Sequence, residues 1–191
     1  MSSTHINRFP NYFADAETDY SKAEFIIFGC PYDKTSSFRA GCKKGPDAIR
    51  QATWNLESFD ILTKIDLSKL LIHDFGNIED LAVKKPIDMM HAISKQAATF
   101  VKDKKIPIGI GGEHSITPGI ITCFPKDTFV IVIDAHLDFR DSYEDESLNH
   151  ACTVRRIVDH IPIKNIAVIG VRSAEKEEYD QALQRSLSFY E

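Results

Sequence analysis

A run of β-branched residues that ends in alternating metal-binding side chains constrains this chain most. Residues 130–133 read Val-Ile-Val-Ile, and Asp134, His136 and Asp138 follow at every second position. Such an apolar run is typical of a strand buried in a parallel sheet. Extended residues two apart project to the same side, so the three polar side chains would share one face. Because ligands bind outside the carboxyl ends of strands in open α/β sheets, we expect a ligand site here.

The types of donor in this segment indicate a metal. Two carboxylates and one imidazole suit a divalent cation that accepts both oxygen and nitrogen ligands. The alternative is a solvated loop that carries two acids and an unrelated histidine. A second strand end favours the metal, because the apolar run at 106–110 is followed by Gly111-Gly112-Glu113-His114. The glycines allow a tight turn and a close backbone approach, so we expect His114 to be a further ligand at the same edge.

Apolar strand segments alternate with helical segments along the chain. We expect strands at 24–29, 70–75, 106–110, 128–133 and 165–171. We expect helices at 46–53, 86–101, from 149 or 150 to about 160, and at 175–187. This alternation predicts an α/β fold, with a parallel sheet and helices on both of its faces.

Local patterns refine two of the helices. In the helix at 86–101, four apolar residues recur near a 3.6-residue period and predict the buried face: Met90, Ile93, Ala97 and Val101. After His114, Ser115 is expected to cap the next helix, with Pro118 in its first turn.

The bulk properties of the chain exclude several classes of protein. A length of 191 residues fits one domain over 1–191, and the net charge of −5 argues against binding driven by nucleic-acid phosphates. There is no apolar run of membrane-spanning length and no apolar signal core at the start, so we expect a cytoplasmic protein that binds no membrane. The four cysteines match no zinc spacing and are expected to remain thiols: Cys30, Cys42, Cys123 and Cys152.

Five motifs, taken in order, resemble those of the ureohydrolase family, which includes agmatinases and arginases. Two of them are the strand-end segments 111–115 and 134–138. The segments 28–33 and 41–50 are similar to the N-terminal pattern of the family, and 150–156 is similar to the segment that holds a catalytic histidine. The resemblance runs from about residue 10 to the end of the chain, and it is greatest to agmatinases.

The resemblance implies an arginase-like three-layer α/β/α fold and a pair of cations. It implies that His114, Asp134 and Asp138 bind one ion, while Asp134 and His136 bind the other, so that Asp134 bridges them. It also implies Mn²⁺, two ions per complete site, although other divalent metals are possible. Carboxylate-rich ligation agrees with Mn²⁺. As to assembly, it implies a homo-oligomer, either a trimer or a hexamer.

The implied reaction is hydrolysis of the guanidinium group of agmatine to putrescine and urea by a metal-bridging hydroxide. In that reaction Asp138 orients the hydroxide, and His150 shuttles a proton to the leaving amine, because imidazole titrates near neutrality. Without the resemblance, His150 reads as an exposed residue at the start of a helix. The loop 139–149 carries four acids and one arginine, which predicts an acidic rim that attracts a small cationic guanidino substrate. Alternatively these acids are merely solvated, and the substrate is arginine or another guanidino compound.

One departure from the family pattern limits the interpretation. The family completes its metal site with two aspartates in a later Ser-x-Asp-x-Asp-x-x-Asp-Pro pattern, which is absent here. We therefore expect a single domain that is incomplete at its C-terminus, with two unpaired central strand edges beside His114 and Asp134. The rival hypothesis is a non-catalytic remnant that binds a partner subunit. A deacetylase on the same fold is disfavoured by the two strand-end motifs together.

Overall fold

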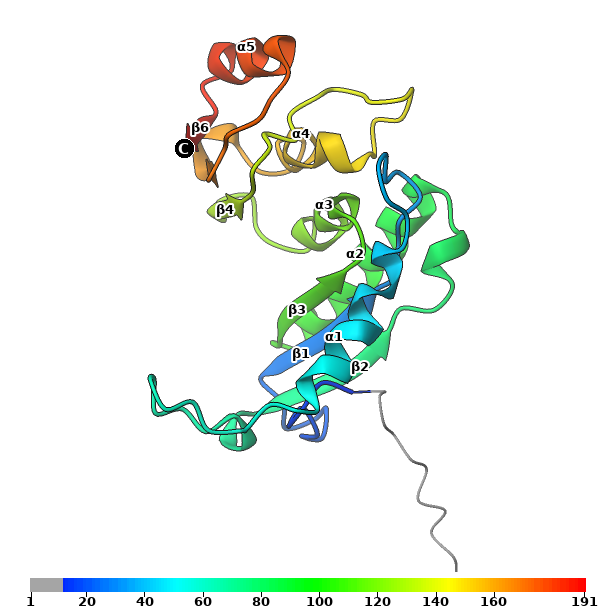
Figure 1. The fold of residues 1–191 in the computed structure, drawn as a ribbon, viewed down its shortest axis with the longest axis vertical. Coiled ribbons are helices and arrows are strands. Elements are labelled where there is room, and N and C mark those ends of the chain that lie inside the picture. Colours follow the sequence, from blue (N-terminus) through cyan, green and yellow to red (C-terminus); the bar gives the residue numbers. More distant parts are fainter. Residues whose placement is uncertain (1–11) are drawn as a thin grey trace, which may run out of the picture.

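The strands form two parallel three-stranded sheets in the computed structural model, which describes residues 12–191 (Figure 1). In the first sheet β1 (Phe25–Cys30) lies between β2 (Ile72–Asn77) and β3 (Ile106–Gly111). In the second sheet β5 (Ile166–Ile169) lies between β4 (Val130–Ile133) and β6 (Ser188–Tyr190). All the pairings between these strands are parallel, as the alternation of strands and helices predicts.

Helices cover both faces of the first sheet. Ile26 and Phe28 of β1 belong to an apolar core with α2 (Pro86–Lys102). Gly29 points to the opposite face, where a Cβ atom would lie 2.9 Å from the Cβ of Pro46 in α1 (Gly45–Thr53). The first sheet is therefore the middle layer of three, which is the layering expected from the sequence.

A buried ion pair joins α1 to β2. The Arg50 side chain is 1% exposed, and its Nε and Nη2 atoms donate to the two carboxylate oxygens of Asp74 at 2.7 and 2.8 Å. Its Nη1 atom donates to Oδ1 of Asn77 at 2.6 Å. A bidentate pair with a further hydrogen bond compensates the charges for their removal from water.

The second sheet is packed differently. Alternate residues of β4 and β5, such as Val132 and Val168, form a core with α4 (Thr153–Ile157) and with Ala182 of α5 (Lys176–Gln184). The intervening residues face the other way, and Ile133 is 83% exposed. Among the described residues, the helices of this half thus pack on a single face of its sheet.

β3 and β4 each have one unpaired edge, as expected from the sequence. Within residues 12–191, β3 pairs only with β1, and β4 pairs only with β5. Apolar side chains along these edges remain open to solvent, including Ile106 at 55% exposed and Ile131 at 67%. The connection between the halves is helical, because α3 (Thr117–Ile121) contacts both α2 and α4.

The structure corrects several local predictions. The buried face of α2 consists of Met89, Ile93, Ala97 and Phe100, so the predictions of Met90 and Val101 were wrong by one position each. Ser115 does not cap a helix, because it lies inside a 3-10 helix at His114–Ile116. Pro118 does stand in the first turn of α3, as predicted.

The remaining corrections concern element bounds. The helix expected up to about residue 160 consists of a 3-10 helix at His150–Cys152 followed by the short α4. The strand β6 was not predicted, because its three residues are too few for a clear alternating pattern. All four cysteines are free thiols. None of the helices within residues 12–191 combines the length and the hydropathy needed to cross a membrane.

Candidate metal centre

The turn after β3 places His114 by a close contact between two backbone segments. A Cβ atom on Gly112 would lie 2.2 Å from the carbonyl oxygen of Tyr32, so a larger residue cannot stand there without a shift. The same oxygen accepts the backbone N–H of Glu113 at 2.8 Å. This contact agrees with the close approach expected from the glycine pair, and it starts the 3-10 helix at His114.

The segment after β4 is bent, whereas the sequence predicts an extended one. Asp134 is still held by the sheet, because its backbone N–H donates to the carbonyl of Ile169 at 3.0 Å. Its Oδ1 atom then accepts the backbone N–H of His136 at 2.9 Å. Asp138 has a φ of 47°, in the left-handed region. The alternation rule for strands therefore does not describe this segment, and its side chains converge through a turn.

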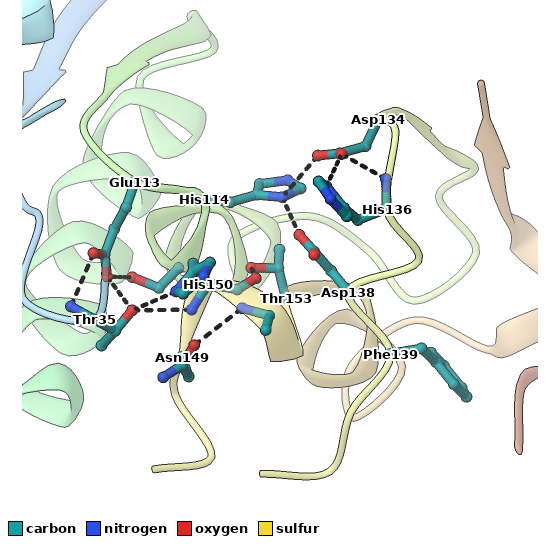
Figure 2. Close-up of polar contacts among 12 residues, drawn as sticks. Thr35, Glu113, His114, Asp134, His136, Asp138, Phe139, Asn149, His150 and Thr153 are labelled. Atoms are coloured by element: carbon teal, nitrogen blue, oxygen red, sulfur yellow. Dashed lines mark hydrogen bonds and ion pairs between the residues drawn. The ribbon is translucent and has the colours of Figure 1, made fainter. Parts of the chain in front are cut away.

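Three of the predicted ligands come together (Figure 2). Nδ1 of His114 lies 2.6 Å from Oδ2 of Asp138 and 3.4 Å from Oδ2 of Asp134. The ligand atoms of these three residues lie within 4.8 Å of one another. They come from both sheets, since His114 follows β3 and the two aspartates follow β4.

His136 lies beside this group but is not part of it. Its Nδ1 atom lies 3.4 Å from Oδ1 of Asp134, and its side chain is 62% exposed. Asp134 therefore directs one carboxylate oxygen towards His114 and the other towards His136. Each oxygen of the Asp134 carboxylate therefore lies beside a different imidazole.

The donor set fits a divalent cation. One imidazole nitrogen and two carboxylates suit a first-row ion that accepts nitrogen and oxygen, and the carboxylate share favours Mn²⁺ over soft, thiolate-binding metals. The side chains of His114 and Asp134 are 27% and 28% exposed, so the cluster is half-buried but reachable from solvent. The four free thiols contribute nothing to it, because no cysteine belongs to the cluster.

His150 lies in the same cavity as two of the predicted ligands. The cavity has a volume of about 460 Å³, and its lining includes His136, Asp138 and His150. His150 begins a 3-10 helix, which Asn149 caps by accepting the backbone N–H of Ala151 at 3.1 Å. His150 therefore has the helix-start position expected from the sequence. Its side chain also lines the cavity.

The acidic residues that line this cavity are not those of the loop 139–149. On the loop 139–149, Asp141 pairs with Arg156 at 2.8 Å, and Glu144 and Asp145 are exposed outside the cavity lining. The carboxylates that line the cavity besides Asp138 are Glu175 and Glu178, at the start of α5. No acid of the loop 139–149 is among the residues that line this cavity, so the acidic rim of that loop stays a prediction.

The loop instead contributes a cation to the cavity. Arg140 pairs with Glu175 at 3.2 Å and with Glu178 at 3.6 Å, and its guanidinium stacks 4.8 Å from the ring centre of Tyr143. The backbone N–H of Phe139 donates to Glu178 at 2.7 Å. Arg140 therefore lines the cavity as a cation that already pairs with two carboxylates.

A buried carboxylate next to the cluster escaped the sequence analysis. Glu113 is 6% exposed and accepts hydrogen bonds from Thr35, Ser36 and Ser115. Burial, and next the negative charges of Glu113 and Glu146, raise the pKa of Tyr32 to about 12. In the sequence, the one signal was the place of Glu113 between Gly112 and His114. Its partners Thr35 and Ser36 lie 78 and 77 positions away, so no local pattern shows that Glu113 contacts them.

The parallel strands, with a His/Asp cluster at their carboxyl ends, define an α/β protein with a candidate metal centre. The family model described as the arginase family matches residues 23–191, and this chain belongs to that family. This confirms the resemblance to ureohydrolases inferred from the motifs.

Named relatives lie within this family. The chain is 43% identical over 168 residues to an "N(1)-aminopropylagmatine ureohydrolase" of Thermococcus kodakarensis, with 87% of this chain and 57% of the relative covered. It is 40% identical over 177 residues to an "Agmatinase" of Pyrococcus horikoshii, with 90% and 59% covered. The chain thus spans somewhat less than two thirds of the length of the curated relatives it matches.

A solved structure confirms the fold. The agmatine ureohydrolase of Thermoplasma volcanium superposes with a TM-score of 0.89 at 39% identity. The match covers 94% of this chain and 61% of that one. The arginase-like α/β fold expected from the sequence is therefore present, in a chain that is shorter than its relatives.

Proposed function

We propose that this chain carries the metal-binding part of an enzyme that hydrolyses the guanidinium group of agmatine to putrescine and urea. The observation that carries the proposal is the convergence of His114, Asp134 and Asp138 from two sheets within 4.8 Å. The names of two relatives support the reaction class, since one is called a ureohydrolase and the other an agmatinase.

The cations would be held by four side chains. His114, Asp134 and Asp138 would hold one Mn²⁺ ion, and Asp134 and His136 would hold a second, with Asp134 shared. The support for sharing is that the two oxygens of Asp134 face different imidazoles. When bound, such ions lower the pKa of water, which supplies a nucleophile at neutral pH. Other divalent ions with the same ligand preferences fit the same residues.

The chain's own residues would orient the attack and move the proton. Asp138 is 8% exposed, and its carboxylate would accept a hydrogen bond from the attacking water and orient it. The water oxygen would form a bond to the guanidinium carbon, the bond from that carbon to the alkyl-bearing nitrogen would break, and the two protons that the water gives up would end on the departing nitrogen, which leaves as an alkylammonium ion. His150 would deliver one of these protons, because it lines the same cavity as Asp138.

The cavity favours a cationic substrate over an amino acid. Among the residues that line it are three acids and one arginine: Asp138, Glu175, Glu178 and Arg140. Arg140 forms ion pairs with Glu175 and Glu178. A second ammonium group is attracted to such a wall, whereas an α-carboxylate is repelled. We infer that agmatine or an N-substituted agmatine fits better than arginine.

Several further properties rest on the family resemblance. We propose that residues 1–191 belong to one domain, a view supported by the contacts of α3 with α2 and α4. We also propose a homo-oligomer, a trimer or a hexamer, located in the cytoplasm. The rival is a non-catalytic chain that binds a partner subunit. It is motivated by the two further ligand aspartates of the family pattern, which the sequence lacks.

The first experiment measures Mn²⁺ binding to the purified chain by electron paramagnetic resonance. We expect His114→Ala and Asp134→Asn to weaken binding at least about 100-fold, because the first removes a ligand and the second removes the charge of a carboxylate placed to serve two cations. Asp141→Asn is the matched control, since Asp141 pairs with Arg155 and Arg156 outside the cluster. Equal binding by all variants would contradict the ligand assignment.

The second experiment measures urea release from agmatine, N(1)-aminopropylagmatine and arginine. We expect release from agmatine and N(1)-aminopropylagmatine, the two cations without an α-carboxylate, loss of release with a chelator, and recovery with added Mn²⁺. Metal binding without release from any substrate, together with a complex that forms with a full-length relative, would favour the non-catalytic rival. Sedimentation equilibrium on the same samples measures the oligomeric state.

A further inference from the structure

Glu113 is a buried carboxylate that the proposed reaction does not use. Its Oε1 atom accepts Oγ1 of Thr35 at 2.5 Å and Oγ of Ser115 at 2.6 Å. Its Oε2 atom accepts the backbone N–H of Thr35 at 2.9 Å and Oγ of Ser36 at 3.1 Å. Within residues 12–191, no lysine or arginine forms an ion pair with it. Glu113 is thus the acceptor of four hydrogen bonds, which compensate the polar group for its burial.

The hydroxyl of Thr35 links this carboxylate to His150. Oγ1 of Thr35 accepts the backbone N–H of His150 at 3.0 Å and lies 3.3 Å from Nδ1 of its ring (Figure 2). Thr35 is 8% exposed and lies 115 positions from His150 in the sequence. The link therefore joins the loop after β1, the turn after β3 and the 3-10 helix at His150–Cys152.

Counting protons at Oγ1 of Thr35 fixes the direction of each bond. A hydroxyl has one proton and two acceptor positions, and an ionised carboxylate can only accept. The proton of Oγ1 goes to Glu113, so the hydroxyl has none left for the ring of His150. The ring contact can then form only if Nδ1 of His150 carries a proton and donates it to Oγ1.

We infer that Glu113 is a positioning residue that acts through Thr35 to hold His150 in the tautomer with a proton on Nδ1. The neutral ring then has its lone pair on Nε2, and the protonated ring delivers its proton from Nε2. This inference rests on the proposed function for the role of Nε2 in proton transfer, but the tautomer itself does not depend on catalysis. The same turn thus provides a metal ligand, His114, and the anchor of the proton-transfer group.

The test is the tautomer of His150, read from the nitrogen chemical shifts of its ring in long-range ¹H–¹⁵N NMR spectra. The metal-free, ¹⁵N-labelled full chain is used at a pH where the ring is neutral, and His150→Gln assigns the signals. We expect a protonated Nδ1 and an unprotonated Nε2. In Thr35→Val, which keeps the shape of the side chain without the hydroxyl, we expect the Nε2-protonated form to become the major one. Thr35→Ser restores the hydroxyl and should restore the original tautomer.

Glu113→Gln tests the source of the effect. The amide can donate to Oγ1 of Thr35, which frees the threonine proton for the ring, so a shift towards the Nε2-protonated form is expected. A wild-type ring protonated on Nε2, or a tautomer unchanged in Thr35→Val, would overturn the inference. Backbone spectra and urea unfolding show whether each variant is folded, and Glu113→Gln decides the matter should Thr35→Val unfold, because an unchanged tautomer in that variant would overturn the inference.

Turnover separates this inference from the proposed function. In a preparation that releases urea from agmatine, Thr35→Val should lower kcat about tenfold with little change in KM, because general acid–base catalysis depends on the placement of its proton donor. Thr35→Ser should recover most of the lost rate. An unchanged kcat with the expected tautomer shift would overturn the positioning role. An inactive chain with the expected tautomer shift would count against the proposed function and leave the tautomer assignment standing.

Discussion

The two sheets of this molecule contribute to the same cluster but are supported very differently. The sheet β2-β1-β3 has helices on both faces, a core through β1 and the buried pair of Arg50 and Asp74. The sheet β4-β5-β6 has its described helices on one face, and Ile133 on the other face is 83% exposed. His114 comes from the well-covered half, and the aspartates come from the half with an open face. The better-packed half therefore presents one candidate ligand of the cluster, and the half with less support presents the other two.

This difference shows that the ligand positions do not follow the depth of packing. Asp134 is held by a backbone hydrogen bond to β5, and Asp138 by its left-handed turn, so local geometry suffices in the second half. In the first half, the close contact of Gly112 with Tyr32 and the buried Glu113 fix the turn. We expect substitutions in the first half to act on stability, and those at the open face of the second half to have little effect.

The largest expected effect on stability is in the first half. Arg50→Ala removes one partner of a buried pair and leaves the carboxylate of Asp74 without its cation, which costs about 3–5 kcal/mol. Arg172→Ala is the control, because Arg172 is exposed, and a change within about 0.5 kcal/mol is expected. Urea unfolding followed by circular dichroism measures both. Equal effects of the two substitutions would mean that the buried pair of Arg50 and Asp74 does not stabilise the first half.

An intermediate effect separates the two faces of the second sheet. Val132→Ala deletes two methyl groups from a core position that is 7% exposed and should cost about 2 kcal/mol. Ile133→Thr, the next residue on the open face, should change the free energy of unfolding by less than about 0.5 kcal/mol. A large cost for Ile133→Thr would mean that this face is covered in solution.

The smallest effect concerns pH. Burial raises the pKa of the Cys30 thiol from 9.0 to about 12, and that of Cys152 to about 11. The unfolded chain therefore loses these protons at lower pH than the folded chain. Stability from this source is present below about pH 9 and falls as the pH rises further, by about 1.4 kcal/mol for Cys30 at pH 10. Unfolding curves at pH 7 and pH 10 measure the loss, and Cys30→Ala should reduce it. A pH-independent curve would contradict the burial of Cys30 in the first-half core.

Much of the fold could be predicted from the sequence, because apolar runs and proline positions act locally. The strands around β1, β3, β4 and β5 followed from such runs, and the start of α2 followed from Pro86. The face of α2 was predicted one position away at two places, because periodicity alone does not fix which neighbours a helix meets. The strand β6 was missed, since three residues give no alternation.

The candidate site was predictable in its residue types but not in its geometry. His114, Asp134 and Asp138 were recognised as donors at strand ends, and they do lie together. The left-handed turn at Asp138 and the link from Glu113 through Thr35 to His150 depend on contacts between distant segments. No spacing in the sequence reports such contacts. The pairing of Asp141 on the 139–149 loop with Arg155 and Arg156 is of the same kind, because these partners lie on another element.

The origin of the ligands in both sheets has a thermodynamic consequence. His114 and the two aspartates belong to halves that share no strand pairing within residues 12–191, so an ion held among them opposes any separation of the halves. Such an ion stabilises the closed arrangement by an amount that grows with its concentration, reaching about 2.7 kcal/mol at one hundred times its dissociation constant. The concentration of divalent ions in the medium would then set how often the two halves separate. It would also set how readily the unpaired edges of β3 and β4 associate with other chains.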